Sequence, residues 1–95
     1  MPDFTVRVEL HGAEWEEYDA LRVEMEAERF SVVVVQESGG MAYELPAGEY
    51  AAFGDVTRQQ VLARARRAAD RSGFNYGILV TESAGRAWYG LDPGV

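Results

Sequence analysis

The chain of 95 residues contains no cysteine, no lysine and a single histidine. Without cysteine there can be no disulfide framework and no thiolate metal site, and one histidine cannot supply a histidine-rich cluster. These absences exclude zinc and iron–sulfur chemistry, and we expect neither a metal site nor another cofactor. All nine basic residues are therefore arginine, whose planar side chain forms paired contacts with phosphate and carboxylate groups.

The chain also lacks long apolar segments. No stretch approaches the roughly 20 apolar residues of a membrane helix, and the N-terminus lacks the basic start, apolar run and cleavage site of a secretion signal. We therefore expect a cytosolic protein without a membrane partner. The hydrophobic content of 47% and charged content of 26% are typical of a folded chain, and the length allows one hydrophobic core, so residues 1–95 should form a single domain.

The charges are sorted by segment. Residues 14–29 carry seven carboxylates and two arginines, whereas residues 57–72 carry five arginines and one carboxylate. The net charge of −7 opposes electrostatic capture of a nucleic acid, since phosphate contacts supply most of the non-specific affinity of such complexes. If both segments are helices, this small acidic protein presents an acidic ridge beside a basic one, which bears on its partners.

Hydrophobic periodicity predicts the order of the elements. Residues 4–10 alternate between apolar and polar, which is typical of a strand with one buried side. Helical spacing predicts helices over 13–29, with Trp15 in its apolar stripe, and over 57–72, which begins with the capping box of Thr57 and Gln60. Further strands are expected over 31–37, from Met41 after a turn at 38–40, and over 75–83. Pro46 and Gly48 should break or bulge the strand between 43 and 53.

This β-α-β-β-α-β order is that of the ferredoxin-like superfold, an α+β fold with one antiparallel sheet and both helices on one face. A turn at residues 84–85 could fold residues 86–91 back as a short additional strand. The other sheet face would show Thr5, Arg7 and Glu9 beside apolar residues of the neighbouring strands. Such a face is too hydrophobic to stay in water over a large area, so we expect a homodimer formed sheet to sheet.

One candidate binding surface lies on the second predicted helix. Arg64, Arg67 and Arg71 recur at spacings of three and four and so share a helix face, which could position phosphates. The same face could instead be solvated, or could pair with acids of the first helix or of another subunit.

A candidate proton-transfer pair lies where the first strand ends. His11 follows two residues after Glu9, and a histidine beside a carboxylate could act as general acid or base in RNA cleavage. Glu9 could also bind a divalent ion, but one carboxylate per chain makes a poor metal site without a second chain.

Several strings together resemble one group of small bacterial proteins: Phe4-Thr-Val-Arg-Val-Glu-Leu-His-Gly-Ala13, Tyr43-x-Leu45-Pro46-x-x-Glu49-Tyr50, Thr57-Arg58-x-Gln60-Val61-Leu62, Leu79-Val-Thr-Glu-Ser83 and Gly85-Arg86-x-Trp88-Tyr89. This group is similar to the GhoS-like endoribonuclease antitoxins of type V toxin–antitoxin systems. The resemblance implies a ferredoxin-like fold akin to the Cas2 nucleases, and cleavage of a single-stranded messenger RNA. It also implies that Arg22, eight residues before Phe30, is the family's functional arginine and that Glu9 is its acidic residue near the end of the first strand.

Two functions therefore stay open, and with them whether the protein is an enzyme. As an antitoxin endoribonuclease, Arg22 would stabilise charge on the phosphate, Glu9 or His11 would move protons, and Arg7 with Arg64, Arg67 and Arg71 would position the RNA. As a non-catalytic interaction module, the acidic first helix would dock onto a basic protein partner. Such a module could act as a regulator, or as a phage-type inhibitor of a nucleic-acid-processing machine.

Overall fold

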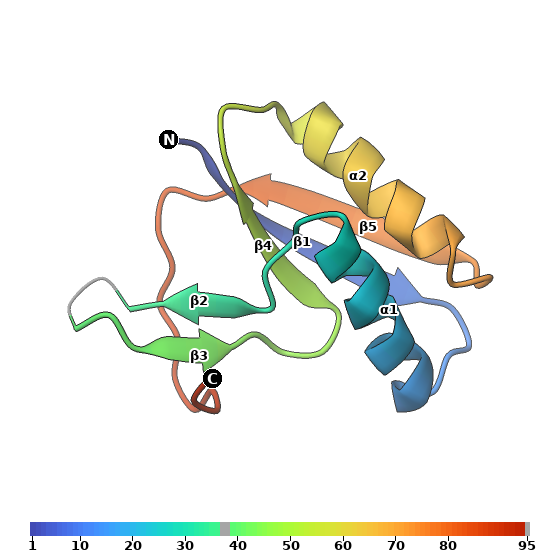
Figure 1. The fold of residues 1–95 in the computed structure, drawn as a ribbon, viewed down its shortest axis with the longest axis horizontal. Coiled ribbons are helices and arrows are strands. Elements are labelled where there is room, and N and C mark those ends of the chain that lie inside the picture. Colours follow the sequence, from blue (N-terminus) through green and yellow to red (C-terminus); the bar gives the residue numbers. More distant parts are fainter. Residues whose placement is uncertain (37–38, 95) are drawn as a thin grey trace.

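The computed structural model describes residues 1–36 and 39–94 and shows an α+β fold (Figure 1). Its main sheet has three antiparallel strands in the order β4-β1-β5, which are Glu49–Phe53, Asp3–Leu10 and Tyr76–Glu82. Two helices, α1 (Trp15–Ala27) and α2 (Arg58–Asp70), lie side by side on one face of this sheet. The predicted α+β class and the placement of both helices on one face of an antiparallel sheet are confirmed, whereas the ferredoxin-like βαββαβ order is not.

The core lies between the helices and β1. Because side chains alternate along a strand, Phe4, Val6, Val8 and Leu10 all point to the helix face, and all four are buried. Leu21 and Met25 of α1 meet them, together with the apolar residues of α2: Val61, Ala65, Ala68 and Ala69. The small alanine side chains let α2 approach the sheet closely.

Local signals set the helix ends. At the start of α2 the Thr57 hydroxyl accepts the Gln60 backbone N–H at 3.1 Å, and the Gln60 amide oxygen accepts the Thr57 N–H at 2.8 Å, which confirms the predicted capping box. Trp15 begins α1 but was expected in its buried stripe, and this prediction is wrong, because the side chain is 68% exposed. The residue lies in the first turn, at the edge of the helix face that carries Leu21 and Met25.

The single four-stranded sheet expected from the sequence is wrong. Strands β2 (Val33–Val35) and β3 (Ala42–Glu44) form a separate hairpin, so the order is βαβββαβ (Figure 1). The segment that leads into β2 pairs with β4 through one isolated bridge, in which Ser31 and Ala51 exchange two backbone hydrogen bonds of 2.8 Å. The Ser31 hydroxyl then bonds to the backbone of Val33 and turns the chain away from β4.

The predicted break between residues 43 and 53 explains the extra strand. Pro46 cannot donate to a ladder, and Gly48 has a φ of 84° and accepts the Val8 N–H at 2.7 Å. The segment therefore ends β3 in the hairpin and begins β4 in the main sheet. Of the expected turn at 38–40, Gly39 and Gly40 have positive φ angles, whereas Ser38 lies outside the described residues, as does Glu37 of the expected strand.

The C-terminal segment crosses from β5 to the hairpin, and the short strand expected over 86–91 is wrong. Arg86 binds Asp3 at 2.8 and 3.0 Å, the Thr5 hydroxyl at 2.9 Å and the Phe4 carbonyl at 2.8 Å. These contacts fix the chain across the start of β1, where it cannot fold back along β5. It bonds to β3 only further on, where the Glu44 N–H donates to the Asp92 carbonyl at 2.8 Å.

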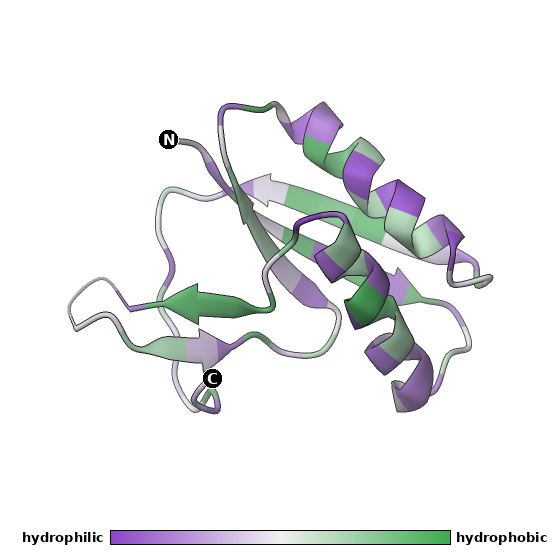
Figure 2. Ribbon diagram, viewed as in Figure 1, coloured by the Kyte–Doolittle hydropathy of each residue, from purple (hydrophilic) through white to green (hydrophobic). Residues whose placement is uncertain are grey.

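Hydropathy follows this architecture. Figure 2 shows apolar stretches along β2 and the middle of β5, while both helices mix polar and apolar residues as expected for elements with one solvated face. Within the described residues, neither helix has the length and apolarity required to cross a bilayer.

Candidate functional site

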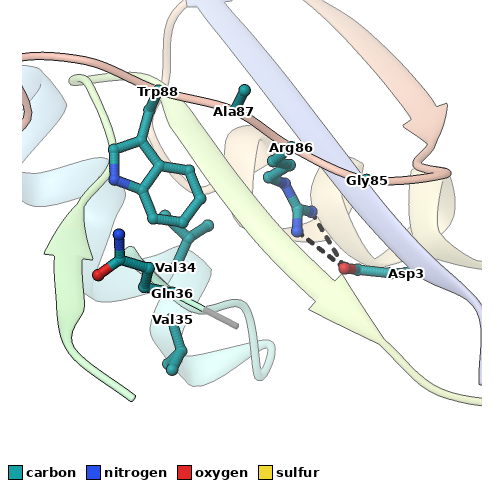
Figure 3. A pocket seen from close by; sticks show the side chains of 8 residues that line it. All are labelled: Asp3, Val34, Val35, Gln36, Gly85, Arg86, Ala87 and Trp88. Atoms are coloured by element: carbon teal, nitrogen blue, oxygen red, sulfur yellow. Dashed lines mark hydrogen bonds and ion pairs between the residues drawn. The ribbon is translucent and has the colours of Figure 1, made fainter. Parts of the chain in front are cut away.

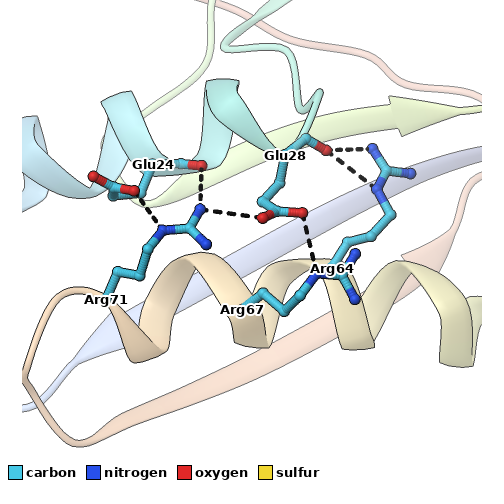
Figure 4. A network of polar contacts seen from close by, with 5 residues as sticks. All are labelled: Glu24, Glu28, Arg64, Arg67 and Arg71. Atoms are coloured by element: carbon cyan, nitrogen blue, oxygen red, sulfur yellow. Dashed lines mark hydrogen bonds and ion pairs between the residues drawn. The ribbon is translucent and has the colours of Figure 1, made fainter.

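The arginine stripe of α2 is directed at α1 (Figure 4). Arg64 donates two hydrogen bonds, of 3.2 and 2.7 Å, to the Glu28 backbone carbonyl. Arg67 contacts the Glu28 carboxylate at 3.3 Å, and Arg71 contacts it at 3.2 Å. Arg71 also binds the carboxylate of Glu24 at 2.5 Å and its carbonyl at 3.3 Å. All three arginines therefore end on the last turns of α1.

The arginines are drawn to this part of α1 by the negative charge at the C-terminal end of a helix. The last carbonyls of α1 lack partners within the helix and carry the negative end of its dipole, yet the last turn of α1 contains no basic residue. The arginines of α2 supply the missing positive charge from outside. Arg64 also covers the Phe30 ring, with its guanidinium carbon 4.8 Å from the ring centre.

The pKa values follow from these contacts. Desolvation opposes ionisation of Glu28, but the hydrogen bonds from Arg71 and Arg67 outweigh it and hold the pKa of this carboxyl below its ordinary value. Desolvation also lowers the pKa of Arg64. Three roles were considered for the stripe: phosphate binding, solvation, and pairing with acids. The structure shows these arginines paired with acids of the first helix.

Arg22 stands apart from this network. Its guanidinium lies 3.6 Å from the Glu26 carboxylate and 3.9 Å from that of Glu44, and its side chain is 45% exposed. It lines an open hollow of 160 Å³ between α1 and the segment that joins β3 to β4, together with Asp19 and Tyr50. Burial raises the pKa of Tyr50 to about 12, although the charge of Arg22 acts in the opposite direction.

Glu9 and His11 lie close together, with 3.5 Å between the Glu9 carboxylate and Nε2 of His11, and both are exposed. Glu9 projects from the face of β1 opposite the helices, as does Arg7, which lies 3.9 Å from Glu49. Arg22 is on α1, across the sheet from Glu9. The structure thus brings Glu9 and His11 together, but it does not place Arg22 beside them.

No clustered ligand set accompanies these residues. In the part of the chain that the structure describes, no three histidine, aspartate or glutamate side chains gather where they could hold a metal ion. A Glu–His pair alone could accept and return a proton, but it offers no fixed cation to stabilise a phosphate.

A second hollow, which sequence reasoning missed, lies between the hairpin and the C-terminal segment (Figure 3). It measures 470 Å³, and Asp3, Val34, Arg86 and Trp88 are among its lining residues. The ring of Trp88 packs 5.8 Å from that of Tyr43. The string Gly85-Arg86-x-Trp88-Tyr89 marked one side of this hollow, but no sequence signal joined it to Asp3, which lies far away in the chain.

The outer face of α1 is the other surface that the sequence did not resolve. It comprises Glu16, Asp19, Val23 and Glu26, which lie opposite the buried Leu21, and Trp15, which lies at its border with the buried face. Trp15 is 68% exposed and Val23 is 64% exposed, so two large apolar side chains stand among three carboxylates. The charge pattern of residues 14–29 indicated the acids, but Trp15 was expected in the apolar stripe and Val23 was assigned to no surface.

A comparison with known protein families and with characterised proteins finds no match to this chain. The resemblance to the GhoS-like antitoxins therefore stays a prediction.

Proposed function

We propose that this protein is a non-catalytic binding module that docks the outer face of α1 onto a basic protein surface. The observation that carries this proposal is the direction of Arg64, Arg67 and Arg71, which end on Glu24 and Glu28 at the C-terminal end of α1. Neutralisation by these arginines is thus confined to one end of the helix, and on the outer face Arg22 pairs with Glu26 at 3.6 Å. Among the described residues, no ion pair reaches Glu16 or Asp19, so these acids are free to meet an outside cation.

The apolar residues on the same face add affinity to this charge. Exposed tryptophan is enriched among the residues that dominate protein interfaces, because a large ring desolvates well at little cost in side-chain entropy. Trp15 and Val23 would bury against the partner, while the surrounding carboxylates would steer it by long-range attraction. The partner that fits is a protein surface with arginine or lysine around an apolar patch.

A charge substitution on this face tests the proposal. An amphipathic peptide of leucine, lysine and arginine is titrated into the protein, with Trp15 emission followed in a Trp88→Phe background. We expect saturable, salt-sensitive binding that Asp19→Arg weakens. Asp55→Arg is the matched control, since it makes the same change of charge at an exposed aspartate outside α1. Equal effects of the two substitutions, or no binding, would contradict the docking surface.

The endoribonuclease antitoxin is the second candidate function, and Arg22 favours it. Its carboxylate contacts of 3.6 and 3.9 Å are long and its side chain is half exposed, so its guanidinium could turn to an RNA phosphate. The acids around it, Asp19, Glu26 and Glu44, would repel that phosphate. For this reason the geometry supports a basic protein partner better than RNA.

An RNA assay separates the two candidates. Single-stranded RNA is incubated with the wild type and with Arg22→Ala, in the presence and absence of a chelator. The binding module predicts intact RNA in every sample. Cleavage by the wild type that Arg22→Ala abolishes would establish the endoribonuclease and refute the non-catalytic role.

A further inference from the structure

Strand β5 has an open edge. It is the outer strand of the β4-β1-β5 sheet, and among the described residues no strand pairs with its other side. The strand is seven residues long and includes Ile78, Leu79 and Val80. An exposed, apolar edge of this length is a template for pairing with another strand.

The register shows which backbone groups face outward. The His11 N–H donates to the Asn75 carbonyl at 2.8 Å, and the Ser83 N–H donates to the Asp3 carbonyl at 2.7 Å. Odd-numbered residues of β5 therefore direct their backbone groups to β1. The even-numbered residues direct theirs to the open edge, and these are Tyr76, Ile78, Val80 and Glu82.

We propose that this edge pairs antiparallel with β5 of a second copy, about a two-fold axis at Leu79. This register sets Ile78 opposite Val80 of the other copy, so the even-numbered residues exchange backbone hydrogen bonds. The two Leu79 side chains, each 64% exposed in the single chain, then face each other as a closely spaced pair. Ile78 and Val80, which are only partly buried, would lose further exposed surface.

The charges of the strand are complementary to this partner. The same register sets Glu82 opposite Tyr76 of the other copy, on the sheet face that carries the helices. Tyr76 lines a hollow with Arg66 and Asp70, and its hydroxyl already donates to the Asp70 carboxylate. Glu82 of the other copy therefore lies near Arg66, which is the cation of that hollow. The two-fold axis produces this Glu82–Arg66 contact twice in the dimer. This self-complementarity favours a second copy over an unrelated strand.

The interface is small, so the dimer should be transient. A single pair of seven-residue strands lies at the low end of specific interfaces, below about 1,200 Å² in total, where complexes are weak. The inference is independent of the α1 docking proposal, because β5 and the outer face of α1 share no residues. The dimer would carry two copies of the outer face of α1.

Charge reversal with rescue tests the pairing. Arg66→Glu and Glu82→Arg each place like charges opposite one another in a homodimer, and both positions are exposed, so the fold should be unaffected. Sedimentation velocity over a wide concentration range should show a wild-type dimer whose dissociation constant rises about tenfold or more in each variant. An equimolar mixture of the two variants should form heterodimers as tightly as the wild type, because each contact again joins Glu and Arg.

Two results would overturn the proposal. One is a wild-type protein that stays monomeric at every concentration. The other is a dimer that both substitutions leave unchanged, which would instead support the sheet-to-sheet dimer expected from the sequence. Leu79→Glu weakens either dimer, so only the rescue by mixing identifies the edge.

Discussion

Replacement of Arg64 by methionine should destabilise the fold more than any other change in the arginine stripe. The guanidinium donates two hydrogen bonds to the Glu28 carbonyl and covers the Phe30 ring at 4.8 Å. Methionine retains most of the apolar stem, so the substitution removes the polar contacts with little loss of packing. The Glu28 carbonyl at the end of α1 loses these two donors.

The expected magnitude follows from these contacts. Hydrogen bonds from a charged donor contribute about 1.5–3 kcal/mol, and the lower end applies here because Arg64 is partly solvated. The cation–π contact adds about 0.5–1 kcal/mol. The sum of about 2 kcal/mol corresponds to a fall in melting temperature of roughly 10 °C for a domain of this size.

The assay is thermal unfolding followed by circular dichroism, with urea unfolding as a second measure. Arg67→Met is the matched control: it removes the same charge from the same helix face, but its contact is a single 3.3 Å bond from a side chain that is 57% exposed. We expect Arg67→Met to change the melting temperature little. Equal melting temperatures for the two variants would refute the idea that Arg64 caps α1.

Two further predictions concern stability. Because burial raises the pKa of Tyr50 to about 12 from the ordinary 10.0, the unfolded chain loses this proton first, so the free energy of unfolding should fall as pH rises from 10.0 towards 12. Urea unfolding across this range should show a shallower fall in Tyr50→Phe, and an identical pH dependence would contradict the raised pKa. Gly48→Ala should cost more stability than Gly90→Ala, because both glycines have positive φ but only a Cβ at Gly48 would meet an atom, the Val8 carbonyl oxygen at 2.8 Å. Equal losses of unfolding free energy in the two variants, measured by urea unfolding, would contradict this prediction and show that the loop at Gly48 moves to accept the Cβ.

Part of the candidate site followed from the sequence. The spacing of Arg64, Arg67 and Arg71 correctly placed them on one helix face, because helical periodicity is a local property. Whether that face met water, phosphate or another helix depended on how α1 and α2 lie on the sheet. The separation of Arg22 from Glu9 likewise depended on which face of the sheet the helices cover.

The sheet shows the same division. Alternation along β1 identified its buried side chains, and Pro46 with Gly48 marked a break in the right place. The consequence of that break was not local: the segment from residue 41 to 53 became two strands, and β2 left the main sheet to pair with the first of them.

The sequence by itself determined the α+β class, the two helices, the alternating core strand and the acidic and basic segments, since each rests on residue type and short-range spacing. Only the tertiary structure decided how the charges are used. The arginines of α2 meet the end of α1 because both helices pack on one sheet face, where the unpaired carbonyls of α1 attract them. The open edge of β5 and the path of the C-terminal segment depend on pairings between residues that are distant in the chain, and these leave no local pattern.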